Sequence, residues 1–179
     1  MMEKREKVSN IILTLFIILL IFTMLQFLSP LLLSTNTYKD FNGIVGVMDN
    51  AEKIDTMPIP LNMAYVFGDR LCHQKSERSF YINGNQMPFC SRCTAIWIGL
   101  TIGLLFTLLF KNELSSTFLM IIIFSLVPIG IDGTGQLLDF WESSNVSRVI
   151  TGLIVGIPVG MALGIIVDEV KSLYKSKIN

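Results

Sequence analysis

The chain has 179 residues, of which 51% are hydrophobic and only 16% are charged, and its mean hydropathy is +0.60. This composition is typical of integral membrane proteins and excludes an ordinary soluble globular domain. With 14 basic and 14 acidic residues the formal net charge is zero, so the chain lacks the basic excess of nucleic-acid-binding proteins and we expect no nucleic acid partner.

The first apolar run covers residues 11–34 and follows a basic segment that contains Lys4, Arg5 and Lys7. A cleavable signal peptide has a hydrophobic region of roughly 7–15 residues followed by a cleavage motif of small residues. The run in this chain is longer and no such motif follows it. We therefore predict a retained membrane-spanning helix.

A long, mostly polar loop, residues 35–92, follows this helix. Within it, residues 61–71 place their apolar side chains on one face, which favours a short helix at the membrane surface. Residues 79–89 read as two short strands around Asn83-Gly84, a dipeptide that favours the type I′ turn of a β-hairpin. We expect this hairpin to bring the residues that precede it close to those that follow it.

Three further apolar runs, residues 94–110, 117–138 and 149–167, are long enough to cross a bilayer. The sequence thus predicts an all-α fold, a single domain over residues 1–179 in which four transmembrane helices form a bundle in contact with the lipid bilayer. The extracytoplasmic loop carries the cysteines and the hairpin. An even number of spans places both termini on the same side.

The distribution of basic residues predicts which side that is. Cytoplasmic segments of membrane proteins carry an excess of Lys and Arg. In the four-helix arrangement the termini and the connection between the second and third helices share one side, which holds Lys4, Arg5, Lys7, Lys111, Lys171, Lys175 and Lys177. We therefore predict a multi-pass protein of the cell membrane with both termini in the cytoplasm, so that the loop 35–92 and the connection 139–147 lie outside.

The fourth helix carries a glycine at every fourth position, namely Gly152, Gly156, Gly160 and Gly164. Small residues with this spacing let two helix backbones approach closely in a membrane. The spacing predicts a tight helix contact, either with another helix of the same chain or with a second copy in a homo-oligomer.

Polar residues at the predicted outer ends of the last two helices form a second group. Asp132 and Gln136 lie one helical turn apart, and Arg148 opens the last helix. An ionisable residue inside a bilayer is costly and usually faces the protein interior or a wet cavity. Asp132 and Arg148 either form an ion pair that only holds two helices together, or they line a functional pocket. In the second case Asp132, Gln136, Glu142, Asn145 and Arg148 are candidate catalytic residues.

All three cysteines and the only histidine lie between Cys72 and Cys93. Cys72, His73, Cys90 and Cys93 are candidate ligands of a tetrahedral metal site, most naturally zinc. Adjacent side chains project in different directions, so Cys72 and His73 need a tight turn to bind one ion together. If only one of them binds, a coordination position stays open for water or substrate. This site predicts a metal-dependent membrane enzyme, for instance a hydrolase with Asp132 or Glu142 as base, or a metal-handling protein.

Two other interpretations of the cysteines stay open. Cys90 and Cys93, separated by two residues at the start of a helix, also suit a membrane thiol–disulfide oxidoreductase, although Cys72 alone provides an incomplete electron relay. Alternatively, a disulfide or a closed zinc site only staples the outer loop of a structural or partner-binding membrane protein.

Several short motifs occur together and in order: C-H-Q at residues 72–74, C-S-R-C-T at 90–94, D-G-x-x-Q at 132–136 and E-S-x-N-x-x-R-x-x-T-G at 142–152. With these motifs, roughly residues 71–156 resemble the family of small multi-pass membrane proteins of archaea and bacteria called domain of unknown function 2085. The resemblance implies a shared site, made of Cys72, His73, Gln74, Arg78, Ser79, Cys90, Arg92, Cys93, Asp132, Gln136, Ser144, Asn145, Arg148 and Gly152. The family has no assigned activity, so the resemblance implies topology and site rather than mechanism.

Overall fold

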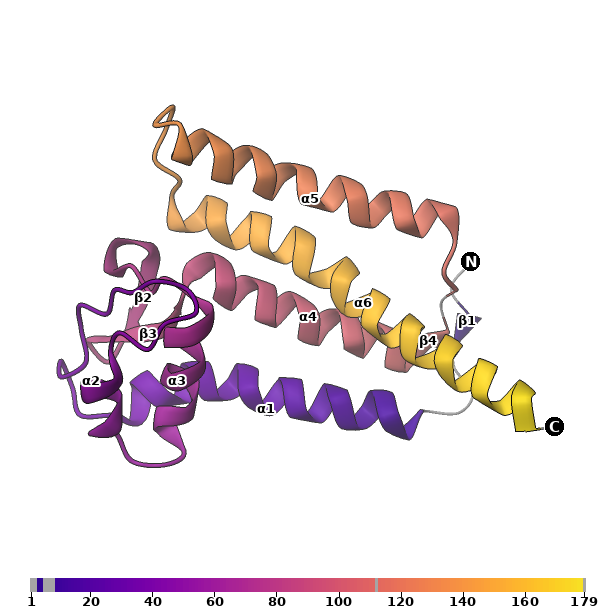
Figure 1. The fold of residues 1–179 in the computed structure, drawn as a ribbon, viewed down its shortest axis with the longest axis horizontal. Helices are drawn as coiled ribbons and strands as arrows, with labels where there is room; N and C mark the ends of the chain where they lie inside the picture. Colours follow the sequence, from indigo (N-terminus) through magenta and orange to yellow (C-terminus); the bar gives the residue numbers. More distant parts are fainter. Residues whose placement is uncertain (1–2, 5–8, 112, 179) are drawn as a thin grey trace.

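The structure is a computed structural model that describes residues 3–4, 9–111 and 113–178. Four long helices dominate it (Figure 1): α1 (Asn10–Leu32), α4 (Ser91–Leu109), α5 (Ser116–Leu137) and α6 (Asn145–Ile178). Each contains a stretch long and apolar enough to cross a bilayer. The predicted helical membrane bundle is therefore confirmed.

Two helices begin earlier than the hydrophobic pattern predicts. α6 starts at Asn145 rather than 149, because Ser144 caps it: the Ser147 amide donates to Ser144 Oγ at 3.1 Å. α4 starts at Ser91 rather than 94. The first turns of both helices contain polar residues, such as Ser91 and Arg92 in α4, so an apolar run does not include them. As a result, the polar residues at these two boundaries lie in first helical turns instead of loops.

α6 lies between α4 and α5 (Figure 1) and packs closely against α4. A methyl group built on Gly156 would lie 2.9 Å from the Cα atom of Gly99, and one built on Gly103 would lie 2.8 Å from the Cα atom of Gly160. These distances are too short for any side chain, so the glycines are what allows the two backbones to touch. The predicted glycine contact thus forms within the chain.

Residues 33–90 fold into a compact cap over one end of the bundle (Figure 1). The cap contains α2 (Ala51–Asp55), α3 (Leu61–Leu71), the 3-10 turn η1 (Ser76–Arg78) and the antiparallel strands β2 (Ser79–Ile82) and β3 (Asn85–Cys90). The predicted short helix and hairpin are both present. Asn83 and Gly84 have φ angles of 54° and 71°, the left-handed conformations that a type I′ turn requires.

The cap is held on α1 by a buried amide. Asn85 Nδ2 donates to the carbonyl oxygens of Pro30 and Ser34, each at 3.0 Å, near the end of α1. Its Oδ1 accepts from the amides of Thr37 and Tyr38. One side chain therefore satisfies the carbonyl groups that the end of a helix leaves without partners and fixes the hairpin above it.

The opposite end of the bundle carries the termini. β1 (Glu3–Lys4) pairs there with β4 (Phe110–Lys111), the short segment that follows α4. β1 and the carboxyl-terminal end of α6 lie on this side, away from the cap (Figure 1). The cap and the connection between α5 and α6 share the other end. The helices thus gather the polar segments predicted to face outside at one end of the molecule.

Candidate metal centre and its polar neighbours

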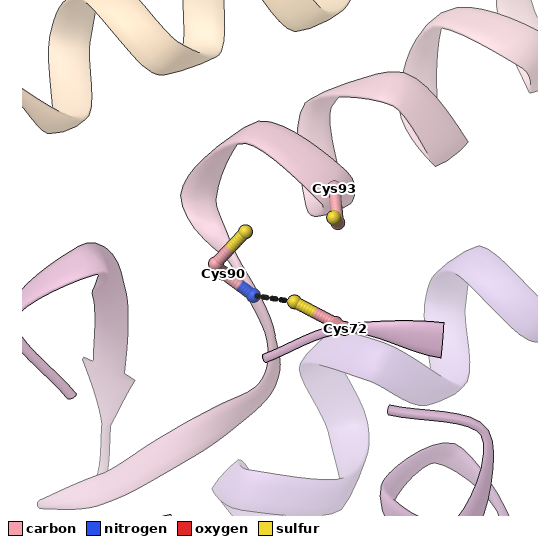
Figure 2. A group of neighbouring side chains, drawn as sticks. All are labelled: Cys72, Cys90 and Cys93. Atoms are coloured by element: carbon pink, nitrogen blue, oxygen red, sulfur yellow. Dashed lines mark hydrogen bonds between the residues drawn. The ribbon is translucent and has the colours of Figure 1, made fainter. Parts of the chain in front are cut away.

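The three cysteines meet where the cap joins the bundle (Figure 2). Cys72 directly follows α3, Cys90 is the last residue of β3, and Cys93 lies in the first turn of α4. Their sulfur atoms all lie within 4.8 Å of one another. The hairpin produces this convergence, because its two strands carry the chain from Cys72 back to Cys90.

The walls of this thiol cluster are apolar. Cys72 and Cys90 are 2% and 3% exposed, and the side chains of Phe22, Phe89 and Trp97 pack around the three sulfurs. Cys93 is half-buried. Solvent or a small ligand therefore has its best access to the cluster on the side of Cys93.

The thiols interact strongly with one another. The Cys72 sulfur accepts a hydrogen bond from the Cys90 amide at 3.3 Å. Hydrogen bonding between the two side chains lowers the pKa of Cys90, and the same interaction raises the pKa of Cys72. The cluster therefore stabilises a thiolate at Cys90, and the thiolate is the form of cysteine that binds metals.

His73 does not join the thiol cluster. Its Nδ1 accepts a hydrogen bond from the Lys75 amide at 3.2 Å, and the ring lies outside the group of three thiols, although it is near enough to Cys90 to interact with it electrostatically. Burial lowers the pKa of the imidazole, which keeps it neutral at pH 7. Of the adjacent residues Cys72 and His73, only Cys72 is part of the cluster. This agrees with the tendency of adjacent side chains to project in different directions.

The donor set fits a zinc ion. Tetrahedral zinc with bonds of about 2.3 Å to sulfur separates its sulfur ligands by about 3.8 Å. The three thiols, all within 4.8 Å of one another, need only small side-chain movements to reach that spacing. A zinc ion held by these three thiols alone would keep a fourth coordination position for water or another ligand.

Asp132, on α5, is the centre of a second cluster. It forms an ion pair with Arg92 of α4, and it accepts hydrogen bonds from Ser143 Oγ at 2.7 Å and Ser147 Oγ at 3.2 Å. Of the two alternatives that the sequence leaves open for Asp132 and Arg148, the simple ion pair between them is therefore wrong. Because α4 begins earlier than predicted, Arg92 lies within the first turn of a helix and reaches Asp132 across the bundle.

Arg148 instead contacts two amides. It donates to Asn145 Oδ1 at 3.1 Å, and Asn145 Oδ1 also accepts from Ser91 Oγ at 2.9 Å. Guanidinium groups only donate, so the Gln136 amide turns its oxygen towards them and accepts from Arg148 Nη2 at 2.9 Å and from Arg78 Nη2 at 3.0 Å. Gln136 thus links α5, α6 and the cap.

The structure brings together most of the predicted polar site. Asp132, Gln136, Asn145 and Arg148 share one connected region, whereas Glu142 is exposed and makes no hydrogen bond or ion pair with a described residue. The prediction missed Ser143, which binds Asp132. No sequence pattern separates it from its neighbour Ser144, because only the turn before α6 decides which of the two points inward.

The thiol cluster and the polar region are neighbours. Arg92 lies between Cys90 and Cys93 in the first turn of α4, and Cys90 and Arg148 are close enough to interact electrostatically. Residues from the cap, α4, α5 and α6 therefore lie close together at one end of the bundle.

Comparison with known proteins gives the same family as the motifs. Residues 72–162 match a family described as "Predicted membrane protein (DUF2085)". An uncharacterised protein of Methanothermobacter thermautotrophicus is 35% identical over 103 residues, which cover 58% of this chain and 89% of the relative. Another of Methanocaldococcus jannaschii is 36% identical over 99 residues, covering 53% and 62%. No solved structure matches. By sequence and by its membrane-spanning helices, the chain belongs to the DUF2085 family of predicted membrane proteins.

Proposed function

We propose that this membrane protein holds a zinc ion at Cys72, Cys90 and Cys93 and acts as a metal-dependent enzyme at the outer surface of the cell membrane. The observation that carries the proposal is the convergence of three thiols from three separate elements within 4.8 Å. Two of them are almost fully buried, and all three sulfurs have an apolar wall around them. A protected cluster of this composition matches the ligand preference of zinc.

The open fourth position supports a catalytic role over a purely structural one. Zinc with three protein ligands lowers the pKa of a bound water and so supplies a nucleophile near neutral pH. Asp132 does not suit the role of base, because both of its oxygens already accept hydrogen bonds. We assign it instead to the orientation of Arg92, which lies between two of the ligands.

Elemental analysis of the purified protein, combined with thiol counting after denaturation, tests the metal centre. We expect about one zinc per chain together with three free thiols, and loss of the metal from Cys72→Ser, Cys90→Ser and Cys93→Ser. His73→Gln is the matched control: it removes the remaining candidate ligand, and because His73 lies outside the thiol cluster we expect it to retain zinc.

The same experiment separates the competing functions. Metal-free protein with one free thiol and a disulfide between Cys90 and Cys93 would replace the proposal with a thiol–disulfide oxidoreductase. Loss of zinc from His73→Gln would mean that the site has four protein ligands, and the enzymatic role would then give way to a structural one.

A further inference from the structure

The polar region beside the thiol cluster carries an excess of positive charge. Three guanidinium groups gather there, those of Arg78, Arg92 and Arg148. Arg78 and Arg148 donate to the same oxygen of Gln136, which places two like charges side by side. Repulsion between two positive charges is strong where water is partly excluded, so these guanidinium groups need negative charge nearby.

The carboxylates of the protein offset only part of this positive charge. Asp132 pairs with Arg92, and the exposed Glu77 lies 3.6 Å from Arg78. Arg148 is only 5% exposed, and among the residues that the structure describes its hydrogen-bond acceptors are the neutral amides of Asn145 and Gln136. Cys90 and Asp132 act on Arg148 only through space and make no hydrogen bond to it. A buried guanidinium without a directly bound anionic partner is costly, and a bound anion would remove that cost.

Two further features point towards an anion. Arg92 Nε is buried and finds no acceptor among the described residues, so it is free to donate to a ligand. In addition, α4 and α6 both begin here, at Ser91 and Asn145, and the amino-terminal end of a helix carries partial positive charge. Both helices are long, so this contribution adds to that of the guanidiniums.

We infer that Arg78, Arg92 and Arg148 form a binding site for a phosphate group, either free phosphate or the headgroup of a phospholipid. A phosphate offers several oxygens to planar guanidinium forks, which bind it through paired hydrogen bonds. Phosphate binding at this site does not require zinc, because in the described chain none of the three arginines forms a hydrogen bond to a cysteine sulfur.

An open groove beside Asp132 gives a reason to include lipids. A space of about 460 Å³ lies between α5 and α6, with Asp132 and Ser147 at one part of its wall. The rest of the lining is mainly apolar and includes Val127, Ile131 and Trp141. A headgroup at the arginines would therefore have space for part of an acyl chain beside it.

Binding measurements on the purified full-length protein test the inference. Inorganic phosphate is titrated while the thermal unfolding midpoint is followed, and retention of phosphatidic acid is compared with that of phosphatidylcholine by native mass spectrometry. We expect saturable binding of at least one phosphate source, weakened at least tenfold by Arg78→Gln. Arg70→Gln removes the same charge from an exposed position of α3 and should bind like the wild type.

The two binding measurements distinguish the possible sources of the phosphate group. Stabilisation by inorganic phosphate identifies a soluble ligand, and selective retention of phosphatidic acid alone identifies a lipid headgroup. Binding of neither, or equal binding by Arg78→Gln and wild type, overturns the inference. Arg78 is the variant of choice because it is partly exposed and lies in the cap, whereas Arg148→Gln also removes a buried packing element. Zinc content measured on the same samples shows whether the metal centre is intact.

Discussion

At the scale of single residues, the structure replaces one ion pair with another. An ion pair between Asp132 and Arg148 was one of the two alternatives that the sequence left open, but the partner of Asp132 is Arg92. The carboxylate therefore ties α5 to α4, a helix with which it otherwise has little contact. The Asp132 carboxylate also accepts hydrogen bonds from Ser143 and Ser147. Arg148 instead donates to the neutral side chain of Asn145.

A double-mutant cycle tests this pairing. Arg92→Gln and Asp132→Asn should each destabilise the protein, because each leaves the opposite charge uncompensated. The double variant should recover part of the loss, with a coupling energy of about 0.5–3 kcal/mol in detergent unfolding experiments. The cycle with Arg148→Gln in place of Arg92→Gln should show a smaller coupling. Equal couplings would contradict the assignment of Arg92 as the partner.

Tyr65 gives a prediction that depends on pH. Its hydroxyl donates to the Gln86 carbonyl at 2.7 Å in the cap, and burial raises its pKa. The unfolded chain therefore loses this proton first, above about pH 10, so stability is present below that pH and falls as the pH rises further. Tyr65→Phe should lose about 1 kcal/mol at neutral pH and show a weaker decline in alkali.

Thermal unfolding between pH 7 and 11 measures both effects. Tyr81→Phe is the control, because Tyr81 is 45% exposed on β2 and its side-chain hydroxyl makes no buried hydrogen bond in the described structure. If Tyr65→Phe declined as steeply as the wild type above pH 10, the buried hydroxyl would not be the source of the alkaline instability.

At the scale of elements, the contact between α4 and α6 is the tightest in the bundle. Gly156→Ala would place a methyl group 2.9 Å from the Cα atom of Gly99, and backbone atoms cannot move aside as side chains do. We expect a loss of about 1–3 kcal/mol, seen as a lower unfolding temperature in detergent. Gly130→Ala on α5 meets no atom within 4 Å and should leave the temperature unchanged or raise it. Similar effects at both positions would argue against a glycine-dependent helix contact.

Local patterns predicted some elements better than others. Asn83-Gly84 identifies the hairpin because only a few residues adopt left-handed φ angles readily, and the four apolar runs identify the helices by length. The starts of α4 and α6 were missed, since the first turns of both helices are polar and carry no hydrophobic signal. The partner of Asp132 and the orientation of His73 depend on how separate helices and the cap align in space, and spacing along one sequence does not contain that information.

At the scale of the whole molecule, every candidate site residue lies at the cap end, and the termini lie at the other. The basic residues near the termini predict that the cap faces outwards. A membrane-impermeant maleimide should therefore label Glu52→Cys in intact cells and Lys171→Cys only after permeabilisation. Both positions are exposed, and the wild type, whose thiols are mostly buried, provides the background. The reverse pattern would place the metal centre in the cytoplasm.

The position of α6 has a consequence for biosynthesis. The ribosome makes α4, α5 and α6 in that order, yet in the folded bundle α6 lies between the other two. When α5 enters the bilayer, its eventual packing partner has not been synthesised, and the glycine face of α4 is still covered only by lipid. The hairpin of α4 and α5 must therefore stay open until the last helix inserts into the gap. Arg92 is made before Asp132, so the partner of this acid is already present in the chain when α5 inserts.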